Sequence, residues 1–333
     1  MTRPVRIAAV AVVLVAAAVA SLSLLRGRTG SSPDVKATLR LKWVYSAGFA
    51  GPIMGKEKGF FKKRGLDLTI NPGGPQLDPI KLVAAGTDQF GITGADRLLL
   101  ARQEGFPVVA IGLDNRYSFV VFTTLAKSGI RKPKDFEGRT VGIQQDDTFT
   151  VYQAMVKAAG VDRRRVKEVT VGFDLAPLLE GKVDVYPSYV INQPVILRSQ
   201  GIAIEVINPR DYGVDFMGNV YFTSEAYLRA NPKAVEAFVY GLAEGLQYTI
   251  SNPREAVDVA VAKDPSLKRA DELALLNALI PQINVAGRRL LWMERADWER
   301  TQAIMLDQGL LKRPIDLDRA FEARFVRAFY QRN

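Results

Sequence analysis

Short runs of apolar and β-branched residues alternate with helix-like patterns along the chain from Leu39 onward. This alternation predicts βαβ units and a largely parallel sheet, because parallel strands need long crossover connections that helices usually provide. The first four predicted strands cover residues 39–45, 66–71, 90–95 and 106–113. With the helices between them, they form one α/β lobe.

A second cycle of strands and helices follows the turn-rich sequence SGIRKPKDFEG. Its predicted strands cover residues 139–144, 167–172 and 183–189. One more strand is predicted at residues 218–224, and the remaining pattern is helical to the end of the chain. The second cycle therefore forms a second α/β lobe.

The two cycles predict an α/β fold of two lobes joined by a hinge. Lobe 1 is assigned residues 39–125 plus 219–333, and lobe 2 is assigned residues 126–218. Extended segments near residues 114–129 and 216–224 would cross between the lobes. Because open α/β sheets bind ligands at the carboxyl ends of their strands, we expect the ligand site in the cleft between the lobes.

The composition excludes several kinds of active site, because the chain contains no Cys and no His. Disulfides, thiolate nucleophiles, Cys/His zinc sites and Ser-His-Asp triads are all ruled out. A Mg²⁺ or Ca²⁺ site made only of carboxylates stays open, but no D-x-D-x-D-G loop supports one. We predict no catalytic residue, no metal and no cofactor.

The net charge of +10 does not indicate a nucleic-acid-binding surface. Residues 1–40 hold six Lys or Arg and one Asp, so they account for +5 of this charge. The two short basic runs, residues 62–64 and 163–165, are not interleaved with aromatic residues as a single-strand binder would require. We therefore interpret them as solvated surface.

The N-terminus is typical of an export signal. Arg3 and Arg6 precede an uncharged run from Ile7 to Leu25, which contains a small-residue A-x-A pattern just before Ser21. An uncleaved membrane anchor is the alternative, because the run of 19 residues is close to the roughly 20 that span a bilayer. Residues 1–25 are thus predicted as signal or anchor, and the Gly/Ser/Pro-rich residues 26–38 as a linker to an extracytoplasmic domain.

The ordered motifs of the chain resemble the exported substrate-binding proteins of ABC importers. The resemblance runs over residues 39–250, in the branch shared by binders of thiamine pyrimidine precursors, sulfonates, nitrate and riboflavin. It rests on Trp43 followed by GKEKGFFKKRGLDL, LVAAGTDQFGITGAD and KDFEGRTVGI. It implies a periplasmic-binding-protein fold of the second topological class (type II), with two lobes that close on one ligand.

The same resemblance implies the partners of the protein. The ligand would be a pyrimidine-like small heterocycle, in the first place a thiamine pyrimidine precursor, with riboflavin or an alkanesulfonate or nitrate as alternatives. The protein partner would be an ABC permease in the membrane, and we expect a monomer that binds no nucleic acid. Some members of the superfamily instead synthesise the thiamine pyrimidine, in a reaction that depends on a histidine and a cysteine-rich iron-binding motif. Because this chain has neither residue type, we favour a binding protein over an enzyme.

The candidate ligand-binding residues lie at or after the carboxyl ends of predicted strands, or in the crossing segments. They are Trp43, Phe49, Asp96, Tyr117, Ser118, Gln144, Asp146, Thr148, Tyr189 and Asn192.

Each candidate also has a purely structural interpretation. In the resembling proteins an aromatic residue of the first strand often stacks on the ligand, which favours Trp43, whereas large aromatics are otherwise core residues. Asp96 could cap the following helix or accept hydrogen bonds from an exocyclic amine. Of the acidic pair Asp146 and Asp147, one is expected to cap a helix and the other to be a hydrogen-bond acceptor, which leaves the ligand's charge open.

Overall fold

The computed structural model of the protein describes residues 34–332. The predicted signal or anchor, residues 1–25, lies outside these residues, as does most of the predicted linker. None of the helices in the described part is both long and apolar enough to cross a membrane.

The first sheet has five strands in the order β2-β1-β3-β10-β4. Strands β2, β1 and β3 are parallel, whereas β10 runs antiparallel to both of its neighbours, β3 and β4. Strand β3 inside the sheet and strand β4 at its edge are both buried along their whole length, as expected for strands covered on both faces. The strands span Val35–Arg40 (β1), Leu66–Asn71 (β2), Phe90–Gly94 (β3), Val108–Leu113 (β4) and Asn219–Ser224 (β10).

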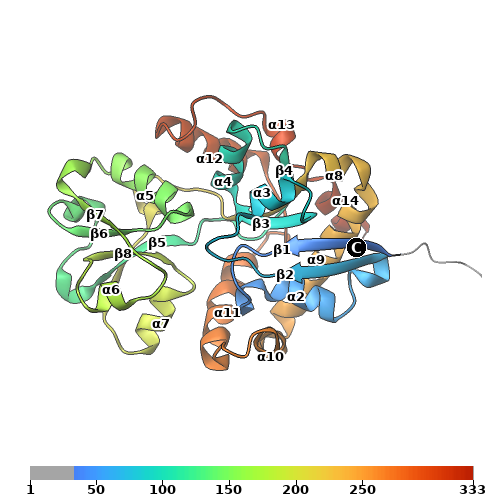
Figure 1. Ribbon diagram of the computed structural model, residues 1–333, viewed down its shortest axis with the longest axis horizontal. Coiled ribbons are helices and arrows are strands. Elements are labelled where there is room, and N and C mark those ends of the chain that lie inside the picture. The colour runs from blue at the N-terminus through green and yellow to red at the C-terminus, as the bar shows by residue number, and fades with distance from the viewer. Residues whose placement is uncertain (1–33, 333) are drawn as a thin grey trace, which may run out of the picture. The chain divides into compact units, whose positions relative to one another are not determined.

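The second sheet repeats this arrangement with the order β7-β6-β8-β5-β9. Strands β7, β6 and β8 are parallel, and β5 runs antiparallel to its neighbours β8 and β9. Figure 1 shows the two sheets as separate groups of strands, green for the second and blue to cyan for most of the first. The strands span Val120–Leu125 (β5), Thr140–Ile143 (β6), Lys167–Thr170 (β7), Val185–Tyr189 (β8) and Ile204–Ile207 (β9).

The structure confirms the α/β class and corrects several predicted boundaries. Strand β1 begins at Val35, inside the predicted linker, because Ala37 and Leu39 alternate with polar residues and point into the core. The last five residues of the predicted first strand, 41–45, form a bend instead. Residues 120–125 were predicted in lobe 1, but as β5 they pair inside the second sheet.

Two other differences concern short segments. Strand β9 was not predicted, because it has four residues and only one of them is buried. The crossing segments differ from the predicted ones. Residues 114–119 lead from β4 to β5 and end earlier than predicted, whereas residues 208–218 lead from β9 to β10 and lie mostly before the predicted 216–224. Two lobes joined by two crossing segments were predicted from the sequence, and the structure has this arrangement. The exact residue limits of the two lobes stay a prediction.

The helices that precede β10 connect successive strands. The parallel strands of each sheet are linked in this way, as expected for βαβ units. These helices are Ala50–Glu57 (α2), Pro79–Ala84 (α3), Ala95–Gln103 (α4), Asp147–Ala158 (α5), Ala176–Leu179 (α6) and Gln193–Ser199 (α7).

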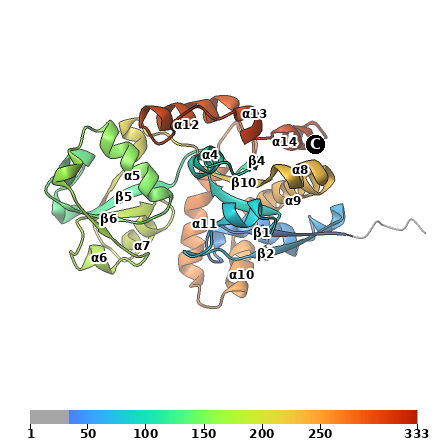
Figure 2. The same cartoon turned by 45° about the horizontal axis from the view of Figure 1, so that its top comes forward.

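The helices after β10 pack mainly on the first lobe, and α9 is the longest of them. Helices α2 and α9 meet through glycines, because a Cβ on Gly245 would lie 2.3 Å from the carbonyl oxygen of Gly51. Figures 1 and 2 show α8, α9 and α14 beside the first sheet. These helices are Glu225–Ala230 (α8), Pro232–Ser251 (α9), Pro253–Lys263 (α10), Arg269–Ile283 (α11), Arg295–Asp307 (α12), Leu317–Ala320 (α13) and Arg324–Arg332 (α14).

Helix α12 fastens the two crossing segments. Its buried Asp297 accepts from Arg300 at 2.7 Å and pairs with Arg116 of the first crossing segment at 3.4 Å. Arg300 also pairs with Asp215 of the second crossing segment at 3.1 Å. In Figure 2 this helix runs between the two groups of strands. The hinge is therefore braced by ion pairs, in addition to the two chain segments that cross it.

Candidate functional site

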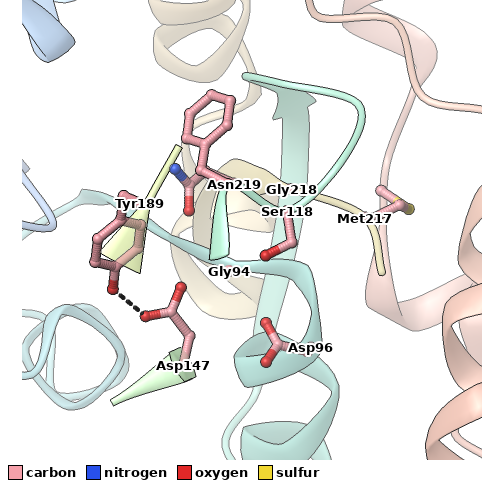
Figure 3. Close-up of a pocket in the computed structure, with 9 residues that line it drawn as sticks. Gly94, Asp96, Ser118, Asp147, Tyr189, Met217, Gly218 and Asn219 are labelled. Atoms are coloured by element: carbon pink, nitrogen blue, oxygen red, sulfur yellow. Dashed lines mark hydrogen bonds between the residues drawn. The ribbon is translucent and has the colours of Figure 1, made fainter. Parts of the chain in front are cut away.

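A small pocket lies where the two sheets face each other, beside the carboxyl ends of β3, β6 and β8. The space inside it is about 220 Å³, part of which is open to solvent. Figure 3 shows its polar side chains converging from both lobes. The lining residues are Gly94, Asp96, Ser118, Phe119, Asp147, Tyr189, Met217, Gly218 and Asn219.

Asp96 is the first-lobe carboxylate of this pocket. It is the second residue of α4, and Gly94 occupies the cap position of that helix. The side chain is buried, and its Oδ2 has no hydrogen-bond partner among the described residues. Burial, and next the nearby Asp147 carboxylate, raise the pKa of Asp96 to about 7. A buried acceptor without a donor is unfavourable, so this oxygen is ready to receive an N–H group.

Asp147 is the second-lobe carboxylate, at the start of α5. Both of its oxygens are bonded: Oδ2 accepts from the Lys42 ammonium at 2.7 Å and Oδ1 accepts from the Tyr189 hydroxyl at 2.6 Å (Figure 3 draws the second bond). Burial opposes ionisation, but the charge and hydrogen bond of Lys42 outweigh it and lower the pKa of Asp147. This carboxylate is therefore a fixed negative charge.

Asp146 is the N-cap of α5. Its Oδ1 accepts from the backbone N–H of Thr148 at 2.9 Å and from the hydroxyl of the same residue at 2.6 Å. Burial and the adjacent Asp147 raise the pKa of Asp146. The sequence prediction that one of the two acidic residues caps this helix is thus confirmed for Asp146.

The cation Lys42 interacts electrostatically with the three carboxylates above and with a fourth one, Asp114. We call Asp96, Asp114, Asp146, Asp147 and Lys42 the polar floor of the site. Burial raises the pKa of Asp114 to about 7, and the buried Tyr221 hydroxyl donates to it at 3.2 Å. The Lys42 ammonium donates to Asn219 Oδ1 at 3.2 Å as well as to Asp147, and so connects the first lobe to the second. Four carboxyl groups thus surround one ammonium.

Aromatic rings face each other beside the polar floor. The rings of Trp43, after β1, and Phe173, after β7, have centroids 4.4 Å apart and are tilted by 57°. Phe173 is one of the exposed large apolar side chains of the described residues. A pair of rings held by opposite lobes can receive a flat heterocycle between them if the lobes separate slightly.

Four of the ten predicted residues lie at or beside the pocket. Asp96, Ser118 and Tyr189 line it. Asp146 adjoins it through the Tyr189 hydroxyl, 3.2 Å away. Trp43 does not line the pocket, and its ring faces that of Phe173. Their role in binding stays a prediction.

The other five predicted residues have other contacts. Gln144 is buried and donates to the carbonyl oxygen of Gly172, and Thr148 is buried against its cap. Phe49 packs on the first-lobe core, and Tyr117 lies under the Arg210 guanidinium, 3.6 Å from the ring centroid.

Asn192, the last of these five, is at the cap position of α7 without a side-chain capping bond. Neither it nor the preceding four lines the pocket.

Sequence reasoning missed four residues that shape the pocket region. The sequence prediction placed Lys42 and Asn219 inside strands, left Phe173 between a strand and a helix, and chose Asp146 rather than Asp147 as the candidate. Polar residues near strand ends are a signal for such sites, but the predicted strand limits hid Lys42 and Asn219. Phe173 follows β7 at the same edge, but a single aromatic residue there gives no signal that separates it from core.

The site has the chemistry of a binding pocket. In residues 34–332 no three acidic side chains are placed so that they could hold a metal ion. The pocket offers carboxylate and amide acceptors, a hydroxyl from Ser118 and flat rings at its side. These groups can orient a flat molecule that carries N–H donors.

Comparison with known protein families and relatives gives consistent results. The family model described as NMT1/THI5 like matches residues 46–256, which is more than half of the chain. The chain is 29% identical to the riboflavin-binding protein RibY of Chloroflexus aurantiacus, with 87% of this chain and 85% of that protein covered. It is 26% identical to the formylaminopyrimidine-binding protein of Halalkalibacterium halodurans, with 92% and 96% covered.

An enzyme is also similar to this chain. It is the 4-amino-5-hydroxymethyl-2-methylpyrimidine phosphate synthase of Legionella pneumophila, which is 22% identical with 89% of this chain and 94% of the enzyme covered.

Solved structures confirm the predicted fold. The alkanesulfonate-binding protein SsuA from Xanthomonas axonopodis pv. citri bound to MOPS superposes with a TM-score of 0.66 at 14% identity, covering 88% of this chain and all of the other. A Candida albicans protein described as having the generic periplasmic binding protein fold gives a TM-score of 0.62 at 12% identity, covering 87% and 96%. At such identities the likeness shows the fold alone.

Proposed function

Because the chain belongs to the NMT1/THI5-like family, we propose that it is the extracytoplasmic substrate-binding protein of an ABC importer. Its two lobes close on one small heterocycle, and the closed form delivers this ligand to a permease in the membrane. The predicted export signal, the two-lobed fold and the relatives named as binding proteins support this proposal.

The observation that carries the choice of ligand is the Oδ2 of Asp96, which has no hydrogen-bond partner among residues 34–332. A buried carboxylate oxygen without a donor favours a ligand that brings one, such as the exocyclic amine of an aminopyrimidine. Trp43 and Phe173 can hold the flat ring from its two faces. We therefore propose a thiamine pyrimidine precursor as the ligand, with Asp96 accepting from its amine.

The charge of the pocket disfavours sulfonates and nitrate. Asp96 and Asp147 both line the pocket, and no Lys or Arg does so among the described residues. An anion placed there would face one fixed negative charge and a second group that ionises near neutral pH. Like charges at such short range are repulsive, so a neutral or cationic ligand is preferred.

Riboflavin is the second candidate, because one of the relatives is named for binding it. Its ring system also carries an N–H donor for Asp96.

A synthase is the alternative from another class, because relatives bear that name. The chain has no His and no Cys, which the family's synthesis reaction is expected to need. We therefore propose binding without turnover.

Isothermal titration calorimetry with a small set of ligands tests this function. The set comprises 4-amino-5-hydroxymethyl-2-methylpyrimidine, formylaminopyrimidine, riboflavin and an aliphatic sulfonate, each added to the full chain. We expect the pyrimidines to bind most tightly and the sulfonate not to bind. Tight binding of the sulfonate alone would refute the proposed ligand, and consumption of a pyrimidine precursor with iron present would refute the binding-only role.

A further inference from the structure

Lys42 reaches from the first lobe to the carboxylate of the second. It follows β1, whereas Asp147 begins α5 more than a hundred residues later in the chain. The 2.7 Å ion pair is partly buried, with 22% of the Lys42 side chain and 8% of the Asp147 side chain exposed. At this depth the pair is screened less by salt than a surface pair.

Lys42 and Tyr189 together occupy both oxygens of Asp147. The Tyr189 hydroxyl donates to Oδ1, and the ammonium of Lys42 lies 5.4 Å from the centroid of the same tyrosine ring. Any ligand in the pocket therefore meets an Asp147 that already has a cation. Asp96 has no such partner for its Oδ2 among the described residues.

The Lys42 ammonium acts on every carboxylate of the polar floor. Its charge lowers the pKa values of Asp147, Asp146, Asp96 and Asp114, each in competition with burial. It is not itself a lining residue of the pocket. Its influence on a ligand is therefore electrostatic.

We propose that Lys42 is a specificity-determining residue, an internal cation that occupies Asp147 so that the cleft selects neutral heterocycles over cationic ones. This inference rests on the proposed function for the ligand class, and it adds the charge of the ligand. The relevant pair of ligands is a neutral aminopyrimidine and thiamine, in which the same ring is joined to a positively charged thiazolium.

The physical reason is competition for one carboxylate. With Lys42 in place, a ligand cation near Asp147 is repelled by the ammonium and finds both oxygens bonded. Without Lys42, Asp147 becomes a buried anion that lacks a counter-charge, and binding of a cation then removes this unfavourable state. A neutral ligand carries no charge that could compensate Asp147, so its affinity does not increase in this way.

The test compares the affinities of thiamine and 4-amino-5-hydroxymethyl-2-methylpyrimidine by calorimetry in four proteins. These are the wild type, Lys42→Met, Lys42→Arg and the double variant Lys42→Met/Asp147→Asn. In Lys42→Met the ratio of affinities should shift toward thiamine by about tenfold or more, because a like charge has been removed at short range. The ratio should stay near the wild-type value in Lys42→Arg, which keeps the charge, and should return toward it in the double variant.

Two outcomes would overturn the inference. One is an unchanged ratio in Lys42→Met, and the other is an equal shift in Lys42→Met and in the double variant, which would show that Asp147 plays no part. Because each ratio is measured within one protein, a general loss of stability does not change its meaning.

A measurement without ligand separates this inference from the proposed function. If neither compound binds the wild type, the proposed ligand is wrong. In that case ¹³C NMR titration of the aspartate carboxyls tests whether Lys42 controls the charge of Asp147. The pKa of Asp147 should rise in Lys42→Met and stay low in Lys42→Arg. An Asp147 that titrates alike in all three proteins would contradict the role assigned to Lys42.

Discussion

Each lobe presents one buried aspartate to the cleft, and the two aspartates differ in their hydrogen-bond partners and in the direction of their pKa shifts. Asp96 and Asp147 each stand at the start of a helix that follows a parallel strand, and both are buried. Asp147 has both oxygens bonded and a lowered pKa, whereas Asp96 has an oxygen without a described partner and a pKa raised to about 7. Burial is common to both, so the partners account for the difference.

This contrast separates a structural carboxylate from one that is available to a ligand. The charge of Asp147 is used to connect the lobes through Lys42. Asp96 keeps an unsatisfied acceptor at the cost of stability, which is typical of sites that gain their partner on binding.

The largest effect is expected from Asp96→Asn. The amide is similar in shape but lacks the negative charge, so the pyrimidine should bind about 10- to 100-fold more weakly, as for loss of a hydrogen bond to a charged group. Calorimetry on the variant measures this loss. Asp211→Asn removes an exposed carboxylate and is the matched control, which should bind like the wild type. Equal binding by Asp96→Asn and the control would contradict the role of Asp96.

The pH dependence of stability should differ in sign between these two aspartates. The folded-state pKa of Asp96 lies above its ordinary value of 3.8, so its contribution to stability is present at low pH and is lost as pH rises through about 7. The folded-state pKa of Asp147 is lowered, so its contribution is present above the ordinary pKa and is lost as pH falls.

The Asp96→Asn variant isolates this difference. Relative to the wild type, it should gain about 2 kcal/mol in the free energy of unfolding between about pH 5 and pH 8, since the wild type alone must ionise the buried carboxyl. Guanidinium titrations at both pH values give the change. Asp114, whose pKa is also raised to about 7, titrates in both proteins and cancels in the comparison. A pH-independent difference would show that Asp96 does not titrate in this range.

A smaller effect is expected from the aromatic rings. Trp43→Ala should weaken pyrimidine binding by about tenfold, because one of the two rings proposed to hold the ligand, Trp43 and Phe173, is lost. Phe49→Ala removes an aromatic of the same lobe that packs on its core, and it should lower stability while affinity stays within about twofold. If Phe49→Ala weakens binding more than Trp43→Ala does, the ligand does not stack on the Trp43 ring.

Much of the fold could be predicted from local sequence, and the reasons are visible in single elements. Strand β2 has the predicted limits because Leu66, Leu68 and Ile70 alternate with polar residues. The assignment of β5 to its sheet could not be predicted, because strand pairing depends on contacts with β8 and β9 that lie far along the chain.

The site was predicted less completely, for a related physical reason. Asp96 lies just after β3 and Tyr189 is the last residue of β8, so the strand-end rule found them. The same rule could not distinguish Asp146 from Asp147, since only the structure shows which of the two faces Lys42. Partners across the cleft are set by the closing of the two lobes, and no local pattern in the sequence encodes them.

The position of β10 fixes an order of assembly during synthesis. This strand separates β3 from β4 in the first sheet, yet it emerges only after all five strands of the second sheet have been made. The second lobe is one continuous stretch of chain and can complete its sheet first. During this time β3 and β4 still lack their partner strand β10, and the edges that it will cover are unpaired. A chain halted before residue 219 would thus expose strand edges open to aggregation, and a chaperone that covers them would matter most in that interval.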